Sequence, residues 1–512
     1  MEVRVIVVGL LWLASAQLID EINNFERVKH KSVLSKRKYR PTYHISAPKG
    51  WLNSPAGFTF FQRQYHIFYQ YHPYNGGWGH IQWGHAVSDN LVDWWHYPPA
   101  IIPREKYEWQ GCLTGTALVQ NNYMTVFYTG TFTEGNDTKR NQNVAISSDG
   151  IIFQKYLYNP IIKEPPTGTD FRNPTVWKNG NMWYMLCGMK NERRLAALGL
   201  YSSRDMFHWH FNGTVAQSYG DMGYMWECPD LFEIDGVHLL ILSVRGIQSD
   251  GSWFTNLYQT GYMVGSFSYR TGRFNEDFEV STATFNVLDY GHDFYATRTM
   301  LSRDGRRLMI AWLGTWESKF VESVDAWASM LTLIRELKLS EQGRLLMQPV
   351  KEIIELRSEM IEEAWYLPGE WFYTGGKAFE LLINSTNTPN EVSITLEWTG
   401  GKYVIDFVSR KGSVTVNRGG NDGMRHADWN PTSSTVNMRI FVDSSSVEVF
   451  CGKGEVVFSS RIYPKGKIRV RVDGDTQVHV VQYQLRRSVR YDKRIRKHLM
   501  KNRNTLQQPL PI

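Results

Sequence analysis

The fold is indicated most directly by the stretch Trp51–Trp95, WLNSPAGFTFFQRQYHIFYQYHPYNGGWGHIQWGHAVSDNLVDWW. It contains short runs rich in Tyr, Ile, Phe and Trp, such as YHIFYQY, which are bounded by turn-forming residues and therefore predict β-strands. Similar aromatic strands recur up to about residue 340, as MTVFYTG, MWYMLCG, HLLILSV and RLMIAWL. The clusters KNGN, EIDG and SRDG separate them and predict tight turns.

The spacing of these strands, without a long helical period, indicates an all-β sandwich, barrel or propeller. Similar units return roughly every 50 to 60 residues, which suits four-stranded propeller blades. We predict an all-β domain over residues 39–340. Residues 341–365, EQGRLLMQPVKEIIELRSEMIEEAW, are charged and helix-prone, and predict a helical linker. Residues 366–485 alternate apolar and polar residues, as in EVSITLEW, and predict a β-sandwich.

The first residues, MEVRVIVVGLLWLASAQ, place Arg4 before an apolar run and the small residues Ala14 to Ala16 after it. This layout predicts a signal peptide over residues 1–16, and the run is short for a membrane anchor. No later apolar run is long enough to span a membrane. Together with three Asn-x-Ser/Thr sequons, the pattern predicts a secreted, extracellular glycoprotein. The sequon asparagines are Asn136, Asn212 and Asn384.

Charge and cysteine content narrow the possible partners and cofactors. The net charge is +7, and a basic C-terminal tail, residues 486–512, accounts for all of it, because residues 486–503 hold nine Lys and Arg against one Asp and the rest of the chain is nearly neutral. A solvated tail is favoured over one that binds nucleic acid or an acidic membrane. The four cysteines are too few and too scattered for a disulfide framework and lack zinc-ligand spacing, so neither a metal nor another cofactor is predicted.

The opening stretch also has the composition of a sugar-binding site. Trp51 and Trp78 could stack on sugar rings, and the amides of Asn53 and Gln70 could bind hydroxyl groups. Core packing is the alternative for each tryptophan taken singly.

Two later segments add charged and polar groups next to prolines. TDFRNPTVW offers Arg172 and Asn173 at the start of a strand, and MWECPDLF places Glu227 beside a tryptophan. Partial burial would suit Glu227 to the role of a general acid, and a surface ion pair is the alternative.

Taken in order, six segments resemble those of glycoside hydrolase family 32, the invertases and related β-fructofuranosidases. Members carry WMNDPNG, WGHAxSxDLVxW, FSGS, FRDP, ECPDLF and YGxDFYA, and this chain has WLNSPAG, WGHAVSDNLVDW, LTGT, FRNP, ECPDLF and YGHDFYA. The later DSSSVEVF also resembles the family. The resemblance runs from about Tyr39 to Leu485 and implies a five-bladed β-propeller followed by a C-terminal β-sandwich.

The resemblance also implies a retaining reaction. In the family an Asp of the first segment attacks the fructosyl anomeric carbon, the Glu of ECPDLF protonates the leaving sugar, and the Asp of FRDP stabilises the transition state. Here the acid/base is Glu227, whereas Ser54 stands at the nucleophile position and Asn173 at the stabiliser position. The substrate contacts that the resemblance implies are Asn53, Gln70, Trp78, Thr114, Arg172 and Trp312.

Both exchanges weaken the reaction. A serine is a poor nucleophile unless a base removes its proton, and no acid or histidine adjoins Ser54 in the sequence. The cationic transition state also loses two nearby negative charges. We therefore predict an inactive or strongly impaired homologue that binds sucrose or a fructoside, a small-molecule partner and not a nucleic acid. The alternatives are an active β-fructofuranosidase with a modified mechanism and an interaction protein without a carbohydrate role.

Overall fold

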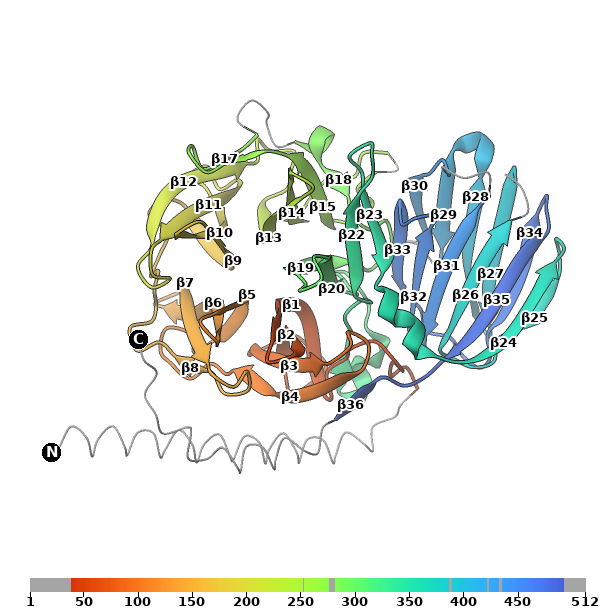
Figure 1. Ribbon diagram of the computed structural model, residues 1–512, viewed down its shortest axis with the longest axis horizontal. Coiled ribbons are helices and arrows are strands. Elements are labelled where there is room, and N and C mark those ends of the chain that lie inside the picture. The colour runs from red at the N-terminus through yellow and green to blue at the C-terminus, as the bar shows by residue number, and fades with distance from the viewer. Residues whose placement is uncertain are drawn as a thin grey trace.

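The computed structural model describes residues 38–251, 253–275, 281–385, 389–420, 423–431 and 435–491. Five sheets surround a central axis, and a pair of larger sheets stands beside them (Figure 1). The prediction of a five-bladed β-propeller followed by a β-sandwich is confirmed. The predicted signal peptide, residues 1–16, lies outside the described residues.

Each propeller blade is built on four antiparallel strands, which follow one another outward from the axis. Blade 1 comprises β1 (Gly50–Phe61), β2 (Gln64–His72), β3 (Gln82–Ser88) and β4 (Trp94–Ile101). Blade 2 comprises β5 (Gly111–Gln120), β6 (Tyr123–Glu134), β7 (Asp137–Ser147) and β8 (Gln154–Lys155). Blade 3 comprises β9 (Thr169–Asn179), β10 (Met182–Lys190), β11 (Ala196–Ser203) and β12 (His210–Gln217).

The last two blades complete the ring. Blade 4 comprises β13 (Met225–Ile234), β14 (Val237–Arg245), β15 (Tyr258–Gly265) and β18 (Asn286–Val287), with a small hairpin of β16 (Phe267–Ser268) and β17 (Arg273–Phe274) beside it. Blade 5 comprises β19 (Tyr295–Leu301), β20 (Arg307–Trp312), β22 (Arg335–Leu339) and β23 (Leu345–Pro349). In the chain segment between β20 and β22, the short strand β21 (Trp327–Ala328) pairs in parallel with β1. This pairing joins the last blade to the first.

The sandwich consists of two sheets of six strands each. One contains β24 (Arg357–Tyr366), β35 (Val478–Leu485), β26 (Phe379–Ser385), β31 (Asn437–Asp443), β32 (Ser446–Cys451) and β33 (Val456–Arg461). The other contains β25 (Trp371–Tyr373), β34 (Arg469–Gly474), β27 (Glu391–Trp398), β28 (Gly401–Val408), β29 (Ser413–Asn417) and β30 (Met424–Asp428).

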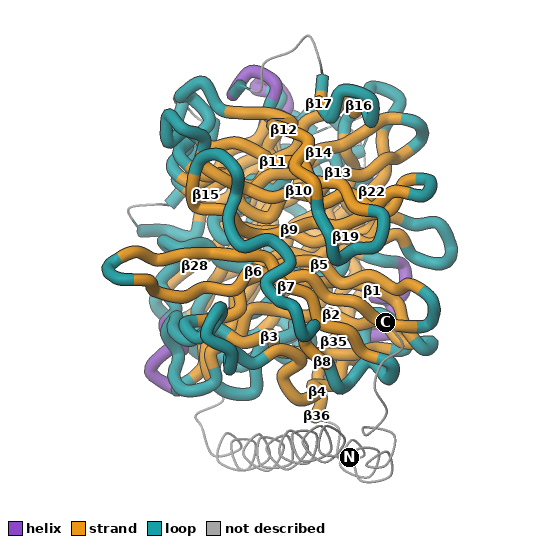
Figure 2. The backbone as a smooth tube through the Cα atoms, turned by 90° about the vertical axis from the view of Figure 1, so that its left-hand side faces the viewer, coloured by secondary structure: helices purple, strands orange, loops and turns teal. Residues whose placement is uncertain are grey.

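The sequence patterns account for these elements. In β2, Ile67 and Phe68 are both fully buried although they point to opposite faces, because each face packs in a different core cluster. The predicted turns join consecutive strands, and the EIDG turn has left-handed backbone at Asp235 and Gly236, which suits a tight hairpin. Helix in the described residues is limited to short 3-10 segments (Figure 2), and none of them is long and apolar enough to cross a membrane.

The structure differs from the predicted helical linker at residues 341–365. This segment forms the end of blade 5, a 3-10 helix at Lys351–Leu356, and β24 of the sandwich. Pro349 lacks the amide hydrogen that a continuous helix would need. The charged stretch that follows pairs along β35, with most of its side chains exposed, so strand pairing at a sheet edge overrides helix propensity.

The C-terminal segment also differs from the prediction of a solvated tail from residue 486. The Arg486 guanidinium makes two hydrogen bonds to the Asp93 carboxylate, at 2.6 and 2.8 Å. The strand β36 (Val489–Tyr491) then pairs in parallel with β4. Residues 492–512 of the predicted tail lie outside the described residues.

The two domains meet through the DSSSVEVF segment. The Asp443 carboxylate accepts hydrogen bonds from the backbone amides of Thr42, Tyr43 and His44, at 2.7, 3.1 and 3.3 Å. The His44 ring lies between Asp443 and Glu448, with ring nitrogen to carboxylate oxygen distances of 2.9 and 2.8 Å. This buried ion cluster fastens the segment before β1 to the β31–β32 hairpin of the sandwich.

Candidate functional site

Most of the sequence-predicted site residues lie on the innermost strands of the blades, where these strands depart from regular pairing, whereas Gln70 lies on β2, Trp78 between β2 and β3, and Trp312 on β20. The pairing shifts between Leu52 and Pro55 in β1, between Leu113 and Gly115 in β5, and between Glu227 and Asp230 in β13. The strand β9 is irregular where it faces residues 186–190 of β10. Such bulges turn a side chain out of the ladder, and neighbouring segments contact one another there, as Thr114 contacts Pro55 and Arg172 contacts Glu227.

The first segment forms a polar chain at Ser54. The Trp51 indole donates to Asn53 Oδ1 at 2.9 Å. Asn53 Nδ2 lies 3.2 Å from Ser54 Oγ and 3.3 Å from Gln70 Oε1, both of which accept from it. Among the described residues, no acid or histidine contacts the Ser54 hydroxyl. The structure thus brings Asn53, Ser54 and Gln70 together without supplying a base for Ser54.

Three predicted sugar contacts have unequal exposure. Thr114 is fully buried, and its hydroxyl donates to the Pro55 carbonyl at 2.7 Å. This hydrogen bond fixes the backbone of β1 next to Ser54. Trp312 is also fully buried and packs edge-on against Trp51 at 5.9 Å. The side chains of these two residues are covered in this structure, as is that of Asn53, and their contact with sugar stays a prediction. Trp78, in contrast, is 54% exposed.

Glu227 is surrounded by donors. Its Oε1 lies 3.2 Å from Arg172 Nη1 and 3.5 Å from Arg245 Nη1, and its Oε2 accepts from the Tyr295 hydroxyl at 2.9 Å. Burial and the negative charge of Glu227 hold the pKa of Tyr295 well above its ordinary value, so Tyr295 remains a donor. The Glu227 carboxylate thus lies between two guanidinium groups and one hydroxyl donor.

Asn173 belongs to the FRNP segment and contacts the ECPDLF segment. Its backbone has a φ of 59°, a left-handed conformation that Asn and Asp adopt more readily than other non-glycine residues. The backbone amide of Asn173 donates to the Thr129 hydroxyl at 3.0 Å. Its side-chain Oδ1 accepts from the backbone amide of Cys228 at 3.5 Å. The side chain therefore ties β9 to the residue that follows Glu227.

Further charged residues at the site were missed by the sequence analysis. The Asp170 carboxylate forms ion pairs with Arg140, Arg172 and Lys190. Asp170 stands two residues before Arg172, and Tyr295 lies in the YGHDFYA segment, so proximity to a motif could have indicated both. Arg140, Lys190 and Arg245 lie outside every motif, on β7, β10 and β14.

The rim of the site includes Trp316, on the segment after β20. Its indole stacks with Trp51 at 6.5 Å, meets Trp78 edge-on at 6.4 Å, and lies 5.7 Å from the Arg245 guanidinium carbon. Trp316 therefore connects the tryptophans of the first segment with the surroundings of Glu227.

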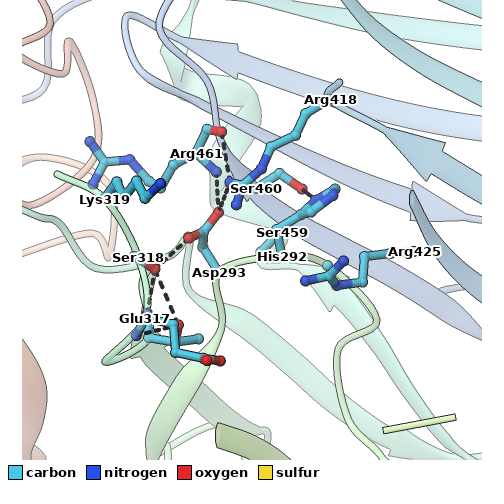
Figure 3. A network of polar contacts seen from close by, with 12 residues as sticks. His292, Asp293, Glu317, Ser318, Lys319, Arg418, Arg425, Ser459, Ser460 and Arg461 are labelled. Carbon is cyan, nitrogen blue, oxygen red and sulfur yellow. Dashed lines mark hydrogen bonds and ion pairs between the residues drawn. The ribbon is translucent and has the colours of Figure 1, made fainter. Parts of the chain in front are cut away.

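Asp293 holds the Trp316 segment against the sandwich domain (Figure 3). Its carboxylate accepts from the Ser318 hydroxyl, from the Arg461 backbone amide at 2.8 Å and from the Arg418 guanidinium at 2.5 Å. These residues line a cleft of about 830 Å³ between the domains. The pKa of Asp293 is lowered, since burial, which raises it, is outweighed by Arg418 and the donated hydrogen bonds.

Nothing in the described residues gathers three or more side chains suited to a metal ion. All four cysteines are buried and unpaired.

Comparison with known proteins agrees with this geometry. Residues 44–349 match the family model for the glycosyl hydrolases family 32 N-terminal domain, and residues 367–487 match the family 32 C-terminal model. Sucrose-6-phosphate hydrolase of Escherichia coli is 34% identical over 443 residues, which cover 84% of this chain and 91% of that protein. Raffinose invertase of Escherichia coli is 35% identical and covers 84% of this chain and 90% of its own.

A solved structure of similar shape is the family 32 β-fructofuranosidase of Bombyx mori. It has a TM-score of 0.84 and 38% sequence identity, and the match covers 91% of this chain and 98% of that one. A mutant of the same enzyme in complex with sucrose has the same TM-score and identity.

Proposed function

The chain belongs to glycoside hydrolase family 32, and on this premise we propose that it is a secreted sugar-binding member whose hydrolytic reaction is lost or strongly impaired. The observation that carries the proposal is the pair of exchanges at Ser54 and Asn173, which stand in the bulged segments of β1 and β9 where the family resemblance implies two carboxylates.

The loss of hydrolysis follows from the surroundings of each group. Ser54 Oγ accepts from Asn53 and meets no base within the described part of the chain that could remove its proton, so it remains a weak nucleophile. Asn173 is neutral and gives no charge to a cationic transition state. Removal of a nucleophile in other hydrolases lowers the rate by about 10⁴ to 10⁶.

Sugar binding is better preserved than catalysis. The amides of Asn53 and Gln70 and the guanidinium of Arg172 remain in place as polar groups. Trp78 and Trp316 offer indole faces at the rim, where sugar rings could stack. The sucrose complex of the Bombyx mori relative supports sucrose or a fructoside as the ligand.

Secretion is part of the same proposal. It is supported by the signal-peptide pattern of residues 1–16 and by the sequons. Asn136 lies at the β6–β7 turn and Asn212 in β12, and both are exposed, as a glycan acceptor must be.

Isothermal titration calorimetry with sucrose tests the binding. We expect saturable heat at millimolar sucrose, and a weaker affinity in Trp78→Ala. Trp365→Ala is a matched control, since Trp365 is 53% exposed but lies on β24 of the sandwich, and should leave the affinity unchanged. Absence of saturable heat for sucrose and for 1-kestose would contradict sugar binding. The hydrolytic part of the proposal is tested separately by fructose release.

A further inference from the structure

The tryptophan at the rim of the candidate site belongs to a segment that both domains hold. Residues 313–326, the Trp316 segment, join β20 to β21 and include a 3-10 helix at Val321–Asp325. On the propeller side, Trp316 meets Trp312 edge-on at 5.2 Å, besides its contacts with the tryptophans of the first sequence segment. On the other side, the segment lies against the sandwich (Figure 3). The position of Trp316 therefore depends on two domains.

Trp316 stands in a tight turn whose geometry is set by Ser318. The Ser318 amide donates to the Thr315 carbonyl at 3.1 Å, which closes a turn with Trp316 as its first central residue. The Ser318 hydroxyl accepts from the Thr315 amide at 2.7 Å. The indole nitrogen of Trp316 is buried and has no hydrogen-bond partner among the described residues. The orientation of the ring therefore depends on ring contacts and on this turn.

Ser318 is held by Asp293, and Asp293 is held by the sandwich. The Ser318 hydroxyl donates to Asp293 Oδ1. The Asp293 carboxylate is buried, and its Oδ2 accepts from the Arg461 backbone amide at 2.8 Å and from Arg418 Nη1 at 2.5 Å. Arg461 ends β33 and Arg418 follows β29, so each sheet of the sandwich contributes one donor (Figure 3). A chain of hydrogen bonds thus leads from the sandwich through Asp293 and Ser318 to the turn that carries Trp316.

A second contact holds the later part of the same segment. Glu322 is fully buried, and its Oε1 accepts from Arg461 Nη2 at 2.7 Å. The Tyr463 hydroxyl lies 2.8 Å from Glu322 Oε2 and 3.1 Å from the Lys319 carbonyl oxygen. This contact fixes the segment beyond Lys319, and the turn before it is held by the Asp293 contact.

The turn has open space behind it. The cleft of about 830 Å³ between the domains is lined on one side by Thr315, Glu317, Ser318 and Lys319, and on the other side by residues of the sandwich. A segment that borders a cleft, and not a packed core, opens at a low free-energy cost when a hydrogen bond is lost. Loss of the Asp293 contact would therefore let the turn move into the cleft and carry Trp316 away from the sugar site.

We propose that Asp293, Ser318 and Arg418 are positioning residues, through which the sandwich sets the affinity of the sugar site by holding Trp316 in place. The inference rests on the proposed function, because it assigns the affinity for sugar at the same rim to a contact between the domains. It gives the β-sandwich a part in ligand binding in addition to its packing against the propeller.

A double-variant cycle measured by calorimetric titration with sucrose tests the proposal. Arg418→Gln and Ser318→Ala should each weaken sucrose binding about fivefold, because the turn of Trp316 is then less well held. In the background of Trp316→Ala, the same changes should alter the affinity by less than about twofold, since the side chain that they position is absent. Arg418→Lys keeps a positive charge beside the Asp293 carboxylate and should recover most of the affinity. A contact that only stabilises the fold would not distinguish the two backgrounds.

Amide hydrogen exchange, followed by mass spectrometry without ligand, measures the opening of the turn directly. Arg418→Gln and Ser318→Ala should each speed exchange in residues 313–326 about tenfold and leave blade 3 unchanged. Ser318→Ala removes only a hydroxyl group, so it is read alone if Arg418→Gln does not fold.

Arg486→Gln is the matched control. Arg486 also donates to a carboxylate outside the sandwich, that of Asp93 in blade 1, at 2.6 and 2.8 Å. Within the described part of the chain it contacts no residue of the Trp316 segment. Its replacement breaks an ion pair of the same kind and should change neither exchange in residues 313–326 nor sucrose affinity.

The outcomes separate this inference from the proposed function. Unchanged exchange in residues 313–326, or losses of affinity that persist in full in Trp316→Ala, would overturn the inference and leave the proposed sugar binding intact. Absence of sucrose binding by the native protein would contradict the proposed function and the assigned effect on affinity. Faster exchange in the variants would then still support the positioning of Trp316 by the Asp293 contact.

Discussion

His44 should make the stability of the protein depend on pH in a defined window. The ring is fully buried between Asp443 and Glu448. Burial acts to lower the pKa of His44, but the hydrogen bonds and charges of the two carboxylates raise it from 6.5 to about 9. A rise of this size corresponds to about 3 kcal/mol of unfolding free energy. Because the pKa is raised in the folded state, this stability is complete below about pH 6.5 and is lost as the pH rises through about 9.

Urea unfolding followed by tryptophan fluorescence, from pH 6 to pH 10, measures this effect in the native protein and in His44→Gln. The buried cysteines also titrate on unfolding at alkaline pH, but they are common to both proteins and cancel in the difference. The advantage of the native protein should therefore shrink by about 3 kcal/mol across the window. His208→Gln, at a strongly exposed position, is the control and should follow the native curve. Parallel curves for the native protein and His44→Gln would refute the reasoning.

The other predictions concern the rim, the C-terminus and the surface. Trp316→Ala should weaken sucrose binding about tenfold through loss of aromatic contact, and unchanged affinity in calorimetry would place the sugar elsewhere. Truncation after Leu485 should lower the unfolding free energy by about 1–2 kcal/mol relative to truncation after Tyr491, because only the shorter chain loses the Arg486 to Asp93 hydrogen bonds and β36; equal urea midpoints would exclude this. Secreted from insect cells, the protein should lose mass on endoglycosidase treatment, and Asn136→Gln should lose less, a difference that mass spectrometry would detect.

The alternation of aromatic strands and tight turns was sufficient to predict an all-β protein, and the resemblance to family 32 was needed to choose the five-bladed propeller. The EIDG turn, for example, carries the left-handed backbone that its Asp and Gly favour. The segment after Pro349 shows the limit of local propensity. Its charged residues favour a helix, yet pairing of β24 with β35 decides its conformation, and that pairing joins residues more than a hundred positions apart.

At the candidate site, too, local sequence patterns identify some residues, and contacts between distant segments determine the others. Asn53, Gln70 and Glu227 could be found because each lies in a recognisable segment, and the structure places Asn53 and Glu227 on the inner strands β1 and β13 and Gln70 on the neighbouring β2. Arg140 and Arg245 come from different blades and have no local pattern, so only the closed ring shows that both lie at the candidate site. The complete burial of Thr114 could not be predicted, because its segment identifies a position and not how far the side chain is covered.

Fructose release from sucrose tests the central claim most directly. The purified native protein is compared with the double variant Ser54→Asp, Asn173→Asp, in which both exchanges restore a carboxylate and Asp tolerates the left-handed backbone at residue 173. We expect background release from the native protein and turnover by the variant that is larger by at least about 10⁴, which adding Glu227→Gln should abolish. Turnover by the native protein that the double variant does not increase would contradict the claim that its hydrolytic centre has been lost.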